Sequence, residues 1–259
     1  MEIPFSKYQG TGNDFVIIDQ MSSPYVQADE KDWIKRACDR KFGIGADGLI
    51  LLSPSDQYDF YMHYFNADGN IGSLCGNGSR CAVEYMFRKN YIDSECMFEA
   101  ADGYHRARAH EGYVELEMRP VEFIEKGVDH FIMNTGSPHY VTFVEDLSDL
   151  DIVQTGQAIR YSNRFREDGI NVNFVESNGD HIEVRTYERG VEDETLSCGT
   201  GVTASALAFA LRNQTSTNIV KVQTKGGELI IRFDQTDSSF RNIWLCGPAT
   251  PVFRGEILK

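Results

Sequence analysis

Two short segments carry the residues best suited to chemistry in this chain. Residues 75–78 (Cys-Gly-Asn-Gly) and 198–201 (Cys-Gly-Thr-Gly) each place a cysteine before glycine-flanked backbone and a helix-forming run. A thiol at a helix N-terminus has a lowered pKa, and the first N–H groups of the helix can bind a carboxylate. Two such thiols, one in each half of the chain, fit a reaction that removes a proton from one face of a carbon and returns one to the other face.

The alternative for each segment is purely structural, because a buried cysteine followed by glycine often serves only as a small hydrophobic residue. The matched pair of segments favours chemistry over that alternative. The remaining cysteines lack the glycine-helix context, so we interpret them as structural: Cys38, Cys81, Cys96 and Cys246.

Polar residues elsewhere could bind a substrate. Arg189 can clamp a carboxylate with two hydrogen bonds, and its neighbour Glu188 can accept from an ammonium group. His139 is a candidate general base, although a lone histidine near a proline turn is more often structural. Asparagines stand beside a strand and a turn at three positions: Asn13, Asn66 and Asn171.

The elements that must position these residues are mostly short strands. Alternating patterns and turn residues predict strands at 60–65, 104–109, 113–118, 172–176, 181–186, 219–223, 229–233 and 242–246. Helices are predicted at 30–40, 79–89 and 202–211, the last apolar on nearly every side and therefore buried. The order of elements is similar in both halves, which favours strands wrapped around a central helix twice over. We expect an N-terminal domain at 1–121, with 249–259 packing back on it, and a C-terminal domain at 122–248.

Composition narrows the classes of partner. The net charge of −14, from 25 Lys and Arg against 39 Asp and Glu, argues against nucleic-acid binding. No apolar run reaches the roughly 18 residues of a membrane span, and the first residues lack a signal-peptide pattern. We therefore expect a cytoplasmic protein with reduced thiols, no membrane association and a small-molecule substrate. Neither Cys-x-x-Cys nor His-Glu-x-x-His spacing occurs, so no metal is expected.

With these motifs in hand, the chain resembles the diaminopimelate epimerases. The matching segments occur in the family's order: 10–15 (Gly-Thr-Gly-Asn-Asp-Phe), 43–48 (Gly-Ile-Gly-Ala-Asp-Gly), 66–69 (Asn-Ala-Asp-Gly), 75–81, 138–139 (Pro-His), 187–190 (Tyr-Glu-Arg-Gly) and 194–201. The resemblance implies an α/β (α+β) fold of two similar domains, each a curled, mostly antiparallel sheet around a central helix. It places the active site in the cleft between the domains.

The resemblance also implies a function. It is a cofactor-independent epimerisation of LL-2,6-diaminopimelate to the meso form, in lysine and peptidoglycan precursor synthesis, by a homodimer. Cys75 and Cys198 would be the two acid–base groups, and His139 and Glu188 would support the catalytic geometry. The substrate-binding residues carried over by motif are Asn13, Asn66, Gly76, Asn77, Asn171, Glu188, Arg189, Gly199 and Thr200.

The chain departs from the family pattern near the distal recognition region. Ser137 stands before Pro-His, where the family usually has Asn, and residues 191–194 carry one residue more than usual. Three other functions stay open: a proline or hydroxyproline racemase relative with another distal pocket, a cysteine hydrolase using one cysteine with His139, and an amino-acid-binding protein without catalysis.

Overall fold

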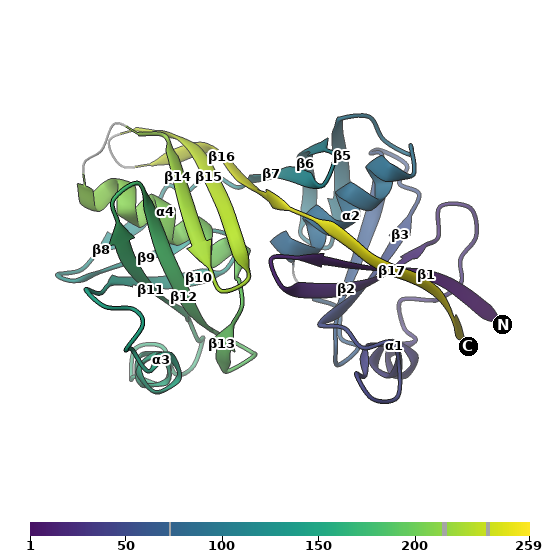
Figure 1. Ribbon diagram of the computed structural model, residues 1–259, viewed down its shortest axis with the longest axis horizontal. Helices are drawn as coiled ribbons and strands as arrows, with labels where there is room; N and C mark the ends of the chain where they lie inside the picture. Colours follow the sequence, from purple (N-terminus) through teal and green to yellow (C-terminus); the bar gives the residue numbers. More distant parts are fainter. Residues whose placement is uncertain (73, 214–216, 237–238) are drawn as a thin grey trace. The chain divides into compact units, whose positions relative to one another are not determined.

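The computed structural model describes residues 1–72, 74–213, 217–236 and 239–259, and the chain divides into two compact units (Figure 1). Unit 1 comprises Met1–Leu116 with Gly247–Lys259, and unit 2 comprises Glu117–Cys246. The division that we drew from the sequence lies a few residues further along the chain, and the domain ranges 1–121 with 249–259 and 122–248 stay a prediction.

Unit 1 is built from strands around one buried helix. Its strands are β1 (Glu2–Gly10), β2 (Asn13–Asp19), β3 (Gly48–Ser53), β4 (Phe60–Asn66), β5 (Glu95–Ala100), β6 (Gly103–His110), β7 (Tyr113–Met118) and β17 (Thr250–Leu258). Its helices are α1 (Lys31–Cys38) and α2 (Gly76–Arg88). β17, at the end of the chain, runs beside β1 (Figure 1). The two strands pair antiparallel, and Glu2 lies opposite Leu258.

Unit 2 repeats this construction. Its strands are β8 (Ile124–Lys126), β9 (His130–Asn134), β10 (Pro138–Phe143), β11 (Asn171–Asn178), β12 (His181–Glu188), β13 (Asp193–Thr195), β14 (Ile219–Thr224), β15 (Gly227–Gln235) and β16 (Phe240–Pro248). Its helices are α3 (Ile152–Arg160) and α4 (Gly199–Asn213).

The strand order proves that the two units are equivalent. In unit 1, neighbours along β17-β1-β2-β3-β4-β5-β6-β7 are antiparallel except for the parallel pairs β2–β3 and β4–β5. In unit 2, neighbours along β8-β9-β10-β11-β12-β14-β15-β16 are antiparallel except for the parallel pairs β10–β11 and β12–β14. The succession is the same, so the predicted pair of similar, mostly antiparallel domains is confirmed.

The central helices are buried because their sequences allow it. α2 contacts β1, β2, β3, β4, β6 and β17, and α4 contacts β9, β10, β11, β12, β14 and β15. Small residues dominate the first turns of both helices, and most residues of each helix are buried, with the exposed ones at the C-terminal end. A helix buried on all sides needs this composition, and it lets the backbone at each N-terminus approach other groups closely.

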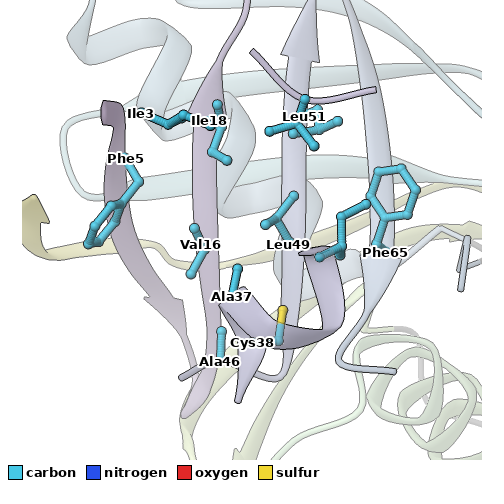
Figure 2. Close-up of a cluster of buried hydrophobic side chains, with 12 residues drawn as sticks. Ile3, Phe5, Val16, Ile18, Ala37, Cys38, Ala46, Leu49, Leu51 and Phe65 are labelled. Atoms are coloured by element: carbon cyan, nitrogen blue, oxygen red, sulfur yellow. The ribbon is translucent and has the colours of Figure 1, made fainter. Parts of the chain in front are cut away.

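The second face of each sheet is covered as well. In unit 1, side chains from β1 to β4 form one buried cluster with the buried face of α1, and this cluster includes Val16, Ile18, Leu49 and Leu51 (Figure 2). All four residues from Phe15 to Ile18 are buried because β2 is covered on both faces, as is usual for strands in parallel pairs. An equivalent cluster that includes Val172 and Phe174 packs beside α3 in unit 2. Among the described residues, no helix is both long enough and apolar enough to cross a membrane.

Candidate active site

Cys75 is the residue that caps the N-terminus of α2. Its backbone is extended, with φ −105° and ψ 111°, and its Sγ accepts from the Gly78 N–H at 3.5 Å. The backbone carbonyl of Cys75 accepts the first helical hydrogen bond, from Ser79 N at 2.8 Å. A thiolate at this position is stabilised by the N–H group and by the positive end of the helix dipole.

The thiol of Cys75 also has an acceptor for its proton. Its Sγ lies 3.6 Å from Asn13 Oδ1, which in turn accepts from Asn77 Nδ2 at 3.4 Å. Asp47 Oδ2 accepts from Asn13 Nδ2 at 2.7 Å and so fixes which end of the Asn13 amide faces the sulfur. Both protonation states of Cys75 therefore have a partner, as an acid–base group requires.

A buried guanidinium contacts the residues that surround Cys75. Arg80, on α2, is fully buried and donates to Asn77 Oδ1 at 3.0 Å and to Thr11 Oγ1 at 3.2 Å. Thr11 has a positive φ of 50°, which is costly for a β-branched residue. The contact with Arg80 helps to hold Thr11 in this conformation, and the turn that it forms leads directly to Asn13.

A network of four charged groups holds the start of β2. Asp14 accepts from Lys7 Nζ at 2.8 Å and from both terminal nitrogens of Arg40, which also reaches Asp47 at 2.7 Å. Burial alone would raise the pKa of Asp14, but the bonds from Arg40 and Lys7 outweigh it and hold that pKa well below its usual range. Because Asp47 also binds Asn13, the network fixes the residue that faces Cys75.

We expect Asp14→Asn to lower the free energy of unfolding by about 1–3 kcal/mol near neutral pH, since it removes charge-assisted hydrogen bonds. The folded-state pKa of Asp14 is depressed, so its contribution is fully present above the unfolded-state pKa of about 3.9 and is lost as pH falls through the folded-state pKa. Urea denaturation should therefore show a difference in the free energy of unfolding between the wild-type protein and Asp14→Asn at neutral pH. This difference should become smaller below about pH 4. The same difference in the free energy of unfolding at neutral pH and below about pH 4 would contradict this account.

Cys198 immediately precedes α4 in unit 2. Its carbonyl accepts from Val202 N at 2.8 Å, and its Sγ lies 3.5 Å from Thr200 Oγ1. The hydroxyl of Thr200 also contacts His139 Nε2 at 2.9 Å, and the Thr200 carbonyl accepts from Thr135 Oγ1 at 2.8 Å. Cys198, Thr200 and His139 thus form one hydrogen-bonded line at the start of the helix.

His139 is fully buried, and its environment disfavours a charged ring. Burial, together with the positive charge of Arg189, lowers the pKa of His139 to about 3. A neutral imidazole of this kind is a poor general base near pH 7, and its Nε2 is already engaged by Thr200 Oγ1. This argues against a hydrolase in which His139 activates a single cysteine.

A second polar cluster lies at the ends of β10, β11 and β12. Asn171 Nδ2 donates to Ser137 Oγ at 2.9 Å, and Asn171 Oδ1 accepts from the backbone N–H of Arg189 at 2.9 Å. The Arg189 guanidinium reaches Ser137 Oγ at 3.4 Å and the Asp168 carbonyl at 2.9 Å. Ser137, the residue before Pro-His, therefore joins two of the predicted substrate-binding residues.

The predicted site residues fall into two groups, one in each unit. Unit 1 brings together Cys75, Asn13, Gly76 and Asn77, and unit 2 brings together Cys198, Gly199, Thr200 and His139. Asn171 and Arg189 share the neighbouring cluster, while Glu188 Oε2 accepts from Thr195 Oγ1 at 2.8 Å. Asn66 is exposed at the end of β4, and no described hydrogen bond joins it to Asn13 or Cys75. The catalytic and substrate-binding roles of these residues stay predictions.

Three supporting residues were missed by the sequence analysis: Thr11, Arg80 and Asn173. Thr11 lies in the first matching motif, and Arg80 lies in the cysteine motif. Asn173 had a clearer signal, because Asn171 and Asn173 alternate with apolar residues in the first half of β11, which is buried. Within the described part of the chain, no three His, Cys, Asp or Glu side chains are arranged to hold a metal ion.

Comparison with known proteins finds relatives by sequence and by structure. The family model described as diaminopimelate epimerase matches residues 5–123 and 131–252. A diaminopimelate epimerase from Flavobacterium psychrophilum is 45% identical over 253 residues, which cover 97% of this chain and 98% of the relative. A diaminopimelate epimerase from Aquifex aeolicus is 37% identical, with 98% of this chain and 97% of the relative covered. A crystal structure of a Bacillus anthracis phenazine biosynthesis protein of the PhzF family has a TM-score of 0.77 at 12% identity, covers all of both chains and shares the fold.

Proposed function

This chain belongs to the diaminopimelate epimerase family, and from that premise we propose that it converts LL-2,6-diaminopimelate to the meso form without a cofactor, using Cys75 and Cys198 as paired acid–base groups. The observation that carries the proposal is the equivalence of the two cysteines. Each precedes the buried central helix of its unit, and each has a polar partner at its sulfur. The family makes the enzyme an isomerase of the amino-acid epimerase type.

In the proposed reaction, one cysteine is a thiolate and the other a thiol. The thiolate takes the proton from the α-carbon of the substrate, and the thiol delivers its own proton to the opposite face of that carbon. The C–H bond breaks on one side and a new C–H bond forms on the other, so the configuration inverts and the two cysteines exchange protonation states. The next turnover can therefore begin in the reverse direction or after proton exchange with water.

The carbanion-like transition state needs stabilisation of negative charge on the α-carboxylate. We propose that the first backbone N–H groups of α2 and α4 provide it, including those of Gly76, Asn77, Gly199 and Thr200, with the side-chain amide of Asn77 as a further donor. These groups stand at helix N-termini, where N–H groups lack helical partners and the dipole favours an anion. Donors fixed before the reaction stabilise developing charge most effectively.

The distal end of the substrate would bind the cluster at the ends of β10, β11 and β12. A guanidinium can clamp the distal carboxylate, which is the role we propose for Arg189. Glu188 would accept from an ammonium group, and Asn13, Asn66 and Asn171 would complete the polar lining. We further propose, from the family resemblance alone, that the enzyme is a cytoplasmic homodimer.

Epimerisation can be tested by incubating the reduced protein with LL-diaminopimelate in deuterated water. We expect meso-diaminopimelate to appear with deuterium at the inverted α-carbon, because the delivered proton comes from a thiol that exchanges with solvent. Nuclear magnetic resonance of the product and chiral separation measure both quantities in one reaction. Binding of the substrate with neither conversion nor deuterium incorporation would refute catalysis and favour an amino-acid-binding protein.

Ser137 gives a prediction about recognition. We expect Ser137→Asn to lower the KM for diaminopimelate about fivefold, because the longer amide can add one hydrogen bond to the substrate beside Asn171 and Arg189. The value of kcat should stay within about twofold, since an interaction made equally in ground and transition states does not change it. Ser177→Asn, on the exposed end of β11, is the matched control and should change neither constant. A fall in kcat at unchanged KM would contradict the assignment.

A further inference from the structure

A line of hydrogen bonds runs through the interior of unit 2 and ends at Cys198. It begins at the backbone carbonyl of Tyr140, passes through the Asn173 amide and the His139 ring, and reaches Thr200. From Thr200 Oγ1 to Cys198 Sγ the distance is 3.5 Å. Asn173 and His139 are both fully buried, so the line is shielded from water over most of its length.

The orientation of the Asn173 amide follows from its partners. One end of the amide lies 3.1 Å from the Tyr140 carbonyl oxygen, which can only accept a hydrogen bond. That end must be the NH2 group. The other end accepts from Thr186 Oγ1 at 3.0 Å, as a carbonyl oxygen does.

This orientation decides where His139 carries its proton. The same Asn173 NH2 group lies 3.0 Å from His139 Nδ1, and an amide nitrogen cannot accept a hydrogen bond. Nδ1 must therefore accept, and it must be unprotonated. A neutral imidazole with a bare Nδ1 has its proton on Nε2, which then donates to Thr200 Oγ1 at 2.9 Å.

We propose that Asn173 is a positioning residue that keeps His139 as the neutral, Nε2-protonated tautomer, so that the Thr200 hydroxyl is free to donate its proton to the Cys198 thiolate. Thr200 Oγ1 accepts from His139, and its own O–H then has Cys198 Sγ within reach. When Cys198 is a thiol, its S–H can instead donate to Thr200 Oγ1, which has a second lone pair. Thr200 can therefore hydrogen-bond to Cys198 in either protonation state, and the His139 ring keeps its Nε2 proton in both.

The other groups around His139 are consistent with a ring that stays neutral. Its neighbours in register on β9 and β11 are Met133 and Asn171, neither of which carries a charge. From the end of β12, Arg189 contributes a positive charge, which opposes a second one on the ring. From the start of α4, Cys198 is the titratable group, and Thr200 stands between it and the ring. No carboxylate is hydrogen-bonded to the ring in the described residues.

The proton position can be measured directly with 15N-labelled protein, using His139→Gln to identify the resonances of this ring among the six histidines. We expect the wild-type spectrum to show a proton on Nε2 and none on Nδ1, unchanged from about pH 5 to pH 9. A proton on Nδ1, or titration of His139 within that range, would overturn the proposal. This measurement needs neither substrate nor activity.

Asn173→Asp replaces the hydrogen-bond donor beside His139 Nδ1 with an acceptor, and it changes the size of the side chain very little. A carboxylate oxygen accepts from Nδ1, so His139 should take up a second proton and titrate within the observable range. The rate at which iodoacetamide alkylates Cys198, measured by mass spectrometry as a function of pH, should then show two ionisations in place of one. Asn178→Asp, the same substitution at the partly exposed end of β11, is the matched control and should leave both the ring and the alkylation profile unchanged.

The kinetic consequence rests on the proposed function. We expect Asn173→Asp to lower kcat about tenfold, which is the order of effect of one hydrogen bond, with KM nearly unchanged. If the wild-type protein exchanges no α-proton of diaminopimelate, the proposed function fails, while the nitrogen resonances still decide the role of Asn173. A wild-type tautomer as expected with an unaltered alkylation profile in Asn173→Asp would refute the link to Cys198.

Discussion

Cys75→Ser and Cys198→Ser are each expected to lower kcat for epimerisation by about 10²- to 10⁴-fold, the usual contribution of a positioned acid or base. A serine hydroxyl is close in size to a thiol but holds its proton far more tightly, so it can neither take the α-proton nor deliver one readily. Both variants should fold, since each replaces one small side chain at a helix start. Rates of conversion in both directions, LL to meso and meso to LL, measure the loss.

The matched control is a cysteine in a different environment. Cys96, on β5, is buried, and burial raises the pKa of its thiol to about 12. It is therefore protonated at neutral pH and cannot act as a base, so Cys96→Ser should leave the epimerisation rate nearly unchanged even if stability falls. Full activity in both Cys75→Ser and Cys198→Ser would refute the two-cysteine mechanism.

Local pattern was sufficient for several elements of the fold. The predicted strands at 104–109 and 113–118 are found as Gly103–His110 and Tyr113–Met118, joined by a turn at Gly112 with a positive φ of 75°. Hairpins of this kind depend on alternation and turn residues, which are close together in sequence. The predicted helices at 79–89 and 202–211 exist but begin three residues earlier, at Gly76 and Gly199. Because glycine has a low helix propensity, the sequence pattern did not indicate the first turn of either helix.

Long-range pairing was the part that local pattern could not supply. β1 and β17 come from opposite ends of the chain, and their register depends on which strand faces are buried in the folded unit. Contacts between distant parts of the sequence also determine the candidate site. His139 was identifiable as a candidate from its motif, but its bond to Thr200 joins β10 to α4. Asn173 acquires its role only because β10 and β11 are parallel neighbours, which brings its amide to His139.

Gly201→Ala is expected to reduce activity about tenfold, the loss expected for Asn173→Asp, because both changes act through the Asn173 amide. A Cβ atom at Gly201 would lie 2.3 Å from Asn173 Oδ1 and 3.3 Å from His139 Cε1. The first distance is far below van der Waals contact, so the Asn173 amide must shift from the position in which it contacts Thr186, Tyr140 and His139. Overpacking of this kind costs about 1–3 kcal/mol of stability, which thermal or urea denaturation would detect.

Gly78→Ala is the matched control, because Gly78 holds the same place in the other cysteine segment. Its added Cβ would meet Phe15 Cε1 at 3.3 Å and Ile50 Cδ1 at 3.4 Å, and small shifts of those side chains can relieve both contacts. Alanine improves helix propensity at both sites by a similar amount, up to about 1 kcal/mol, so the difference between the two variants isolates the collision with Asn173. We therefore expect Gly201→Ala to lose both more stability and more activity than Gly78→Ala. Equal losses in the two variants would mean that the space beside α4 is not needed for Asn173, and that the line from Asn173 to Cys198 does not govern the reactivity of that thiol.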